Sequence, residues 1–169
     1  MQVLDFNTGI DFGAKGNLKE FGPVGFSSNP DDVSTWSAKP FVELNFRLPP
    51  LRRDLGITVQ VFPFLPDGAP VTKQDCWVYV NGLLVHFCSV SAPSEIGFTV
   101  SREIVSPRAN RLSFVLPNAL SPSELKLGDD LRKLGLAFVK AERGAGIARG
   151  PQHRIRDLRG SHGETIATA

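Results

Sequence analysis

The chain has 169 residues and a net charge of +2, from 19 basic and 17 acidic side chains. Its size fits one domain, and 41% hydrophobic with 21% charged residues is ordinary globular composition, which excludes a fibrous or wholly disordered chain. So small a net charge argues against nucleic acid as a partner. No apolar run reaches the roughly 20 residues of a membrane helix, so we expect no membrane insertion. The first residues lack the basic-then-apolar order of a secretory signal, which predicts a cytoplasmic protein.

Short apolar segments, separated by Gly and Pro, follow one another to about residue 140. Over residues 41–48 apolar and polar side chains alternate strictly, which is typical of a half-buried strand. Pro49 and Pro50 end this strand. The same reasoning predicts strands at residues 3–6, 41–48, 57–64, 97–105, 111–116 and 134–139, and a hairpin over 75–88.

Seven or eight short strands at such intervals predict an all-β fold, a two-sheet antiparallel β-sandwich of the jelly-roll type. Ser121, followed by Pro122 and Glu124, predicts one short helical turn. From Ala141 onward Gly and Arg interleave and apolar residues become sparse. We therefore expect a β-sandwich domain over 1–140 and a disordered Gly/Arg-rich tail over 141–169.

The most informative segment is 75–88, where Asn81-Gly82 separates two alternating apolar runs. Asn-Gly in this setting is the strongest short-range signal for a hairpin. A two-residue turn pairs residue 80 with 83, 78 with 85 and 76 with 87. This register predicts a core face of Cys76, Val78, Val80, Leu83, Val85 and Phe87, and an opposite face of Asp75, Trp77, Tyr79, Leu84, His86 and Cys88.

The same register places the chain's two cysteines, Cys76 and Cys88, on opposite faces of the hairpin. A disulfide, which needs Cβ atoms about 3.5–4.5 Å apart, is then excluded. Two reduced cysteines fit a cytoplasmic protein. A zinc site would need further ligands, and the remaining histidines lie in the expected tail. We therefore expect no metal site and no cofactor.

On this register Trp77, Tyr79 and His86 form an aromatic surface with polar edges. Such a surface can stack on the apolar face of a sugar ring and hydrogen-bond its hydroxyls, so these residues are candidates for glycan binding. Trp36 is a second aromatic candidate. The alternative is that the aromatic side chains lie under a loop or the second sheet. The sequence contains no nucleophile elbow, phosphate loop or dinucleotide fingerprint, so we expect no enzyme.

Four segments occur in a distinctive order: Gly25-Phe26-Ser27, Trp36-Ser37, residues 78–82 and residues 130–135. Together they resemble small β-sandwich modules found beside or fused to bacterial glycosyltransferases and other cell-surface polysaccharide biosynthesis proteins. The resemblance covers residues 20–140, and Phe26 stands where the family pattern has Trp. It implies an accessory, carbohydrate-related role without transferase activity.

Five residues of these segments have expected structural roles. Arg132 can form a charge-assisted pair with Asp129 or Asp130, and Gly135 lets another part of the backbone approach closely. Asn81 and Gly82 form the hairpin turn. We therefore interpret Asn81, Gly82, Asp130, Arg132 and Gly135 as residues that define the fold.

Two non-enzymatic functions remain open at this point, and an enzyme with an unrecognised site is a third, less favoured alternative. The first is a non-enzymatic module that binds a glycan through Trp77, Tyr79, His86 and Trp36, or that supports a polysaccharide-building partner. The second is a scaffold that docks a glycosyltransferase through its exposed sheet or its basic tail and binds no sugar. The sequence leaves the ligand, the partner and the oligomeric state undetermined.

Overall fold

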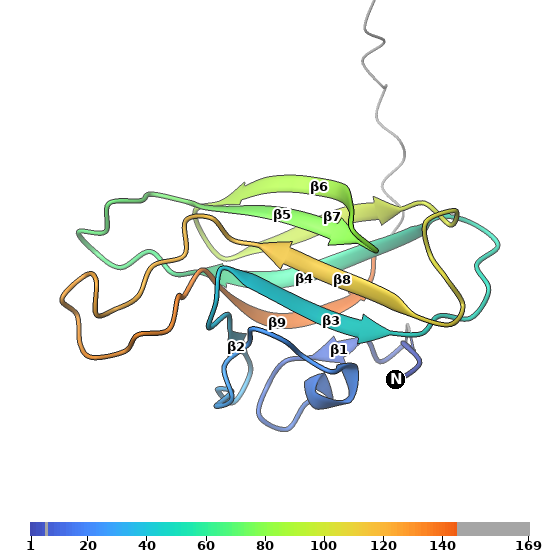
Figure 1. Cartoon of the computed structure of the whole chain (residues 1–169), viewed down its shortest axis with the longest axis horizontal. Helices are drawn as coiled ribbons and strands as arrows, with labels where there is room; N and C mark the ends of the chain where they lie inside the picture. Colours follow the sequence, from blue (N-terminus) through green and yellow to red (C-terminus); the bar gives the residue numbers. More distant parts are fainter. Residues whose placement is uncertain (6, 145–169) are drawn as a thin grey trace, which may run out of the picture.

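The computed structural model describes residues 1–5 and 7–144 and shows an all-β sandwich of two antiparallel sheets (Figure 1). Its elements are β1 (Ile10–Asp11), η1 (Leu18–Phe21), β2 (Thr35–Trp36), β3 (Phe41–Phe46), β4 (Leu55–Pro63), β5 (Gln74–Val80), β6 (Leu83–Val90), β7 (Ser94–Val100), β8 (Asn110–Val115) and β9 (Leu136–Arg143). Within the described residues no helix is long and apolar enough to span a membrane. The predicted fold class is confirmed.

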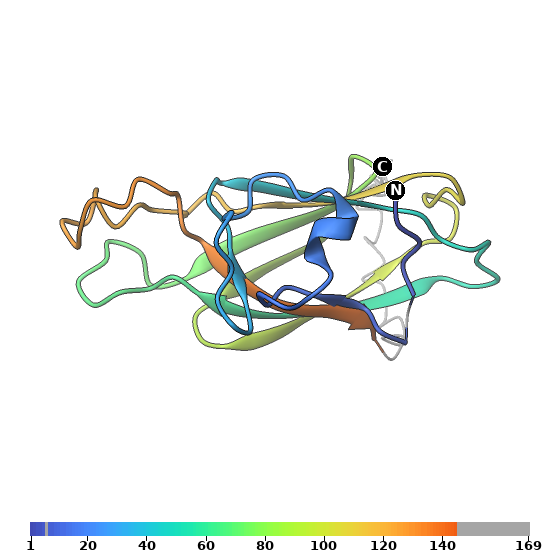
Figure 2. The ribbon, with the colours of Figure 1, turned by 90° about the horizontal axis from the view of Figure 1, so that it is seen from below.

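One sheet has the strand order β1-β9-β4-β7, with β2 also paired to β9, and the other has the order β3-β8-β5-β6. Consecutive strands β6 and β7 belong to different sheets, and each lies at the edge of its own sheet. Viewed from below, the segment before β3, in blue, lies against β9, in orange (Figure 2). The N-terminal segment thereby covers one edge of the five-stranded sheet.

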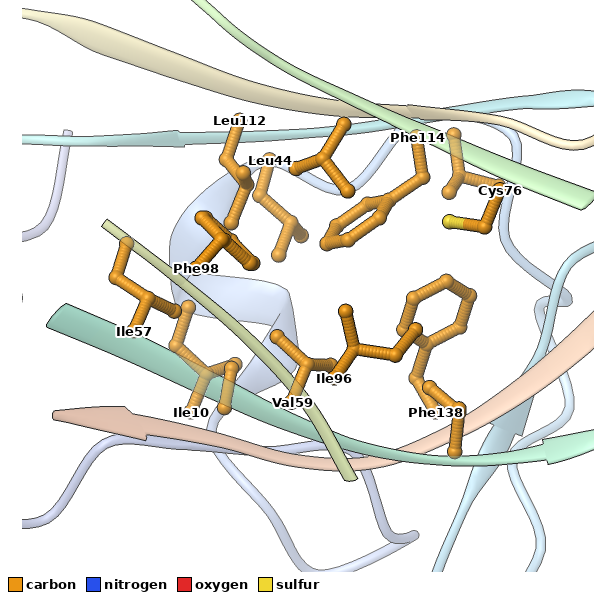
Figure 3. Close-up of a cluster of buried hydrophobic side chains, with 14 of the residues drawn as sticks. Ile10, Leu44, Ile57, Val59, Cys76, Ile96, Phe98, Leu112, Phe114 and Phe138 are labelled. Carbon is orange, nitrogen blue, oxygen red and sulfur yellow. The ribbon is translucent and has the colours of Figure 1, made fainter. Parts of the chain in front are cut away.

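The core forms where alternate side chains of the two sheets meet (Figure 3). Phe138 of β9 is fully buried, and its ring packs against those of Phe12, Phe26 and Phe114, with centroids 5.5, 5.3 and 5.0 Å away. Aromatic rings at these separations contribute packing energy beyond their buried area. This cluster joins β9 and β8 to the N-terminal segment.

Most predicted strands are confirmed with ends shifted by a few residues, and the one expected at 3–6 is not. The strand expected at 97–105 is β7, which begins at Ser94 and ends at Val100. Of the strand expected at 3–6, Val3 forms only an isolated bridge to Arg47, and residue 6 lies outside the described residues. Strand β9 continues past residue 140 to Arg143 because Ala141 pairs with both neighbouring strands. Residues 145–169 of the expected tail also lie outside the described residues.

The helical turn expected at Ser121 is a hydrogen-bonded turn and not a helix. The Ser121 hydroxyl accepts a hydrogen bond from the Glu124 amide, and the Glu124 carboxylate accepts one from the Ser121 amide. This is the reciprocal pattern of a capping box, but Lys126 has a φ of 58° and the chain does not continue into a helix. The helix of the described residues is η1, which sequence analysis missed.

We expect Phe138→Ala to lower the free energy of unfolding by about 3–5 kcal/mol, because it leaves a cavity among three packed rings. Phe62→Ala is the matched control, since Phe62 is 42% exposed on the neighbouring strand β4. We expect that control to change the free energy by about 0.5 kcal/mol or less. Denaturant titration of both variants is the measurement, and equal losses would contradict this account of the core.

Candidate functional site

The β5–β6 hairpin turns at Asn81-Gly82, where both residues have positive φ, 52° and 84°. This is the conformation that favours Asn-Gly in two-residue hairpin turns. The Asn81 amide group donates to the Ile104 carbonyl oxygen at 2.7 Å, and its side-chain oxygen accepts from the Arg111 amide at 2.9 Å. These hydrogen bonds connect the turn to β8 and to the segment that precedes it.

Beyond the turn the register differs from the predicted one by a single residue. Val80 pairs with Leu83 and Tyr79 with Leu84, but Val78 pairs with His86, so Val85 is an extra residue in β6. A β-bulge of this kind reverses the face on which every later residue of the bulged strand lies. The prediction assumed an uninterrupted ladder, and its pairing is wrong for β6 from residue 85 onward. Leu83, predicted to be core, is 54% exposed.

His86 consequently does not share a face with Trp77. It lies on the core side, where its ring stacks on Phe98 of β7 with centroids 6.0 Å apart and planes at 20°. Burial lowers the pKa of His86. Phe87 takes the outward position and is 54% exposed, although it was predicted to be core.

The bulge also corrects the prediction for the cysteines. Cys88 lies directly opposite Cys76, so the two thiols are on the same face and not on opposite faces. Both cysteines are free in the structure.

The outward face of the four-stranded sheet carries an apolar row that crosses all four strands. We call it the ring row, and it consists of Phe41, Val115, Trp77 and Phe87, each the cross-strand partner of the next. Phe41 is 43% exposed and Trp77 is 40% exposed. The rings of Trp77 and Phe87 lie 6.4 Å apart. Four neighbouring strands thus present one continuous apolar line to solvent.

Hydrogen-bonding side chains flank the ring row on one side. Glu43, Ser113 and Tyr79 form the next cross-strand line. The Ser113 hydroxyl donates to the Glu43 carboxylate at 3.1 Å. Next to this line is a shallow hollow of about 280 Å³, to which Arg111 also contributes. A ligand on the rings would therefore have carboxylate, phenol and guanidinium groups within its reach.

The other side of the ring row is polar as well. Asp75 pairs with Ser89, whose hydroxyl donates to the Asp75 carboxylate at 2.5 Å. The Lys73 ammonium lies 3.3 Å from the same carboxylate. The hydrogen bond from Ser89 holds the pKa of Asp75 below its ordinary value, with a smaller contribution from Lys73. This edge is therefore charged at neutral pH.

Trp36 lies on the opposite side of the sandwich. Its neighbour Thr35 pairs with the buried Phe138, whereas Trp36 pairs with Ala137 and so points away from the core. There its ring meets Phe64 edge-on, with centroids 5.9 Å apart. Trp36 and Trp77 therefore cannot contact one compact ligand together.

Sequence analysis missed Phe87 and Phe41 as members of the outward surface. Phe87 was assigned to the core because a bulge leaves no mark in an alternating apolar pattern. Phe41 was detectable in part, since alternation over 41–48 places it opposite to the buried Val42 and Leu44. Its position beside Trp77 depends on β8 pairing with both β3 and β5, which no local pattern reveals.

Residues 130–135, the last of the four segments of the family resemblance, form contacts within the protein. Arg132 pairs with Asp130 and not Asp129: its Nε donates to both carboxylate oxygens at 3.0 Å. Its Nη1 donates to the Ser27 hydroxyl at 2.8 Å, which connects this loop to the segment before β2. The Arg132 guanidinium holds the pKa of Asp130 below its ordinary value.

A Cβ on Gly135 would lie 2.9 Å from the Leu116 side chain. Space at this position is therefore limited by the packing of the neighbouring loop.

A hollow of about 470 Å³ lies apart from the ring row, between η1 and the loop that precedes β2. Its lining combines small loop residues with Lys15, Lys19 and Phe26. It brings together none of the predicted binding residues. Within the part of the chain that the structure describes, no cluster of three or more potential metal ligands occurs.

No known protein-family model and no curated protein matches the chain. Solved structures of similar fold include an active-site mutant of a family two carbohydrate esterase from Clostridium thermocellum, with 15% identity and a TM-score of 0.43. That match covers 74% of this chain and 32% of the esterase, so the chain spans about a third of the esterase's length. A family 6 carbohydrate-binding module matches with 7% identity and a TM-score of 0.40, over 75% of this chain and 89% of the module. At such low sequence identities and TM-scores, neither match supports assigning the function of the similar protein to this chain.

We expect the half-buried His86 to make stability depend on pH. Because its pKa is lower in the folded protein than the ordinary 6.5, the unfolded chain takes up the proton first as the pH falls. Stability attributable to this residue is therefore present above about pH 6.5 and is lost below it. Urea titrations of the wild type and of His86→Phe, at pH values from about 7.5 to 5, test this. The wild type should lose more stability than the variant, and parallel pH curves would contradict the assignment.

Proposed function

We propose that this protein is a non-enzymatic carbohydrate-binding module whose ligand lies on the outward face of the four-stranded sheet. The observation that supports this is the ring row, in which Phe41, Trp77 and Phe87 are exposed in a line across the strands. Sugar rings offer apolar C–H faces to stack on aromatic rings and a rim of hydroxyl groups. Aromatic side chains flanked by a few placed polar groups meet both requirements.

The spacing of the ring row favours an extended oligosaccharide over a single sugar. Neighbouring strands lie about 4.8 Å apart, so Phe41 on β3 and Trp77 on β5 are separated by about 10 Å. A single sugar would contact Trp77 and Phe87 alone. A chain that lies across the strands would contact all three rings.

Each residue of the surface has a role in this proposal. Trp77 and Phe87 are the central stacking pair, and Phe41 extends the stacking surface. Tyr79 and Glu43 are the hydrogen-bonding groups on one side, with Asp75 on the other. His86 and Trp36 lie off this surface, so the proposal does not include them.

The finer proposal is that the module serves bacterial proteins that build cell-surface polysaccharide, beside a glycosyltransferase and in the cytoplasm. Its support is the sequence resemblance over residues 20–140. Co-purification of the full chain with a glycosyltransferase of the same organism is the corresponding test.

A second candidate function is docking of a protein partner, without sugar binding. The exposure of Leu83 and Leu84 favours it, because both lie on β6, an edge strand of the four-stranded sheet. Apolar side chains on an unpaired edge are typical of surfaces that bind other proteins.

We expect a glycan array probed with the full chain to identify an oligosaccharide, and Trp77→Ala to weaken its binding about tenfold or more, since a stacked ring is lost. The matched control is Trp36→Ala, which removes the same ring from the opposite side and should leave the affinity unchanged. Calorimetric titration measures both, and circular dichroism checks the fold.

Equal losses from the two tryptophan variants would refute the assignment of the site to the ring row. If the folded protein binds no glycan on the array, the docking candidate is favoured instead. In that case Leu84→Asp should release a partner that the wild type retains.

A further inference from the structure

Cys76 and Cys88 are direct cross-strand partners in the antiparallel pair of β5 and β6. Opposed residues of such a pair have Cα atoms about 4.5–5.5 Å apart and side chains on the same face. Disulfides form across Cα separations of about 4.4–6.8 Å. The backbone therefore already holds these two residues at a distance suited to a disulfide.

The surroundings of the two side chains agree with the register. Cys76 is fully buried, and Figure 3 shows its side chain among those of the core. Cys88 is half-buried and packs against the same core. Each side chain is the first cause of the shift in the other's pKa, which places the two thiols close together. Their sulfur atoms thus meet on the inner side of the sheet.

The two thiols differ in accessibility and acidity. Cys88 lies on the edge strand β6, and the hydrogen bond from Cys76 lowers its pKa. The pKa of Cys76 is raised by the same hydrogen bond and by burial. The thiolate is the reactive form of cysteine, so Cys88 is the thiol that reacts first with an oxidant from solvent.

We propose that Cys76 and Cys88 are a redox pair that forms a reversible intramolecular disulfide on exposure to a hydroperoxide. The Cys88 thiolate attacks one peroxide oxygen, the O–O bond breaks, and the departing hydroxide takes a proton and leaves as water. The sulfur of Cys76 then attacks the sulfenic acid of Cys88, the S–O bond breaks, and a second water leaves with the Cys76 proton. In total two thiols lose two electrons and one hydrogen peroxide becomes two waters.

The disulfide would close residues 76–88 into a loop and fasten the edge strand to β5. Cys76 precedes Trp77 and Cys88 follows Phe87, so the bond would fix the strand pair that carries both rings. The proposal concerns the inner face of the hairpin and does not depend on sugar binding at the outer face.

The test uses the reduced full chain, treated with one equivalent of hydrogen peroxide, unfolded and then alkylated with N-ethylmaleimide. We expect a monomer whose mass is lower by two hydrogen atoms, no alkylation, and a peptide map that links the two cysteines. Dithiothreitol should restore both alkylation sites. The oxidised protein should also melt about 5 °C or more higher than the reduced form, because the cross-link limits the unfolded chain.

The single variants separate the roles of the two thiols. In Cys76→Ser, oxidation should stop at a Cys88 sulfenic acid, which dimedone traps. In Cys88→Ser, the buried Cys76 should remain unoxidised. The wild-type measurement decides the proposal even if a variant does not fold. Two alkylated cysteines in oxidant-treated wild type, or a disulfide found only between two chains, would overturn it.

Discussion

The structure depends on one constraint: each strand must turn alternate side chains toward the opposite sheet, because only there are they removed from water. Burial of Val42, Leu44, Phe114, Cys76 and Val78 on the inner side of the four-stranded sheet forces their neighbours outward. Those neighbours include Phe41, Val115 and Trp77. Formation of the core therefore determines that the ring row faces solvent. It does not determine that the residues of the row are apolar.

A single extra residue in β6 determines the chemistry of both faces of the hairpin. Because Val85 is unpaired, the rest of β6 is shifted in register by one residue relative to β5. Phe87 then joins Trp77 outside, whereas His86 and Cys88 face the core. Without the bulge the strand would place an imidazole beside the indole and would separate the two thiols. The proposed binding face and the proposed redox pair both follow from this irregularity.

The sequence predicted those parts of the structure that local pattern controls. Alternation located most strands, and Asn81-Gly82 located the hairpin turn. The other features depend on pairing between strands, which a local pattern does not reveal. The bulge in β6 leaves no mark in the alternation of apolar residues, and the alignment of Phe41 with Trp77 arises from pairing of strands distant in sequence. For the same reason Trp36 could be recognised as a candidate but not placed on the side of the sandwich away from Trp77.

The most direct test of the account is to locate a bound oligosaccharide on the folded chain by amide chemical-shift mapping in solution. Adding the best glycan-array ligand to isotope-labelled full-length protein should shift amide signals of β3, β5, β6 and β8, with the largest changes around Trp77 and Phe87. Signals of β1, β2 and β9 should stay in place, because they belong to the other sheet. Shifts concentrated in the five-stranded sheet, or in the hollow beside η1, would contradict the central claim that the ring row is the binding surface.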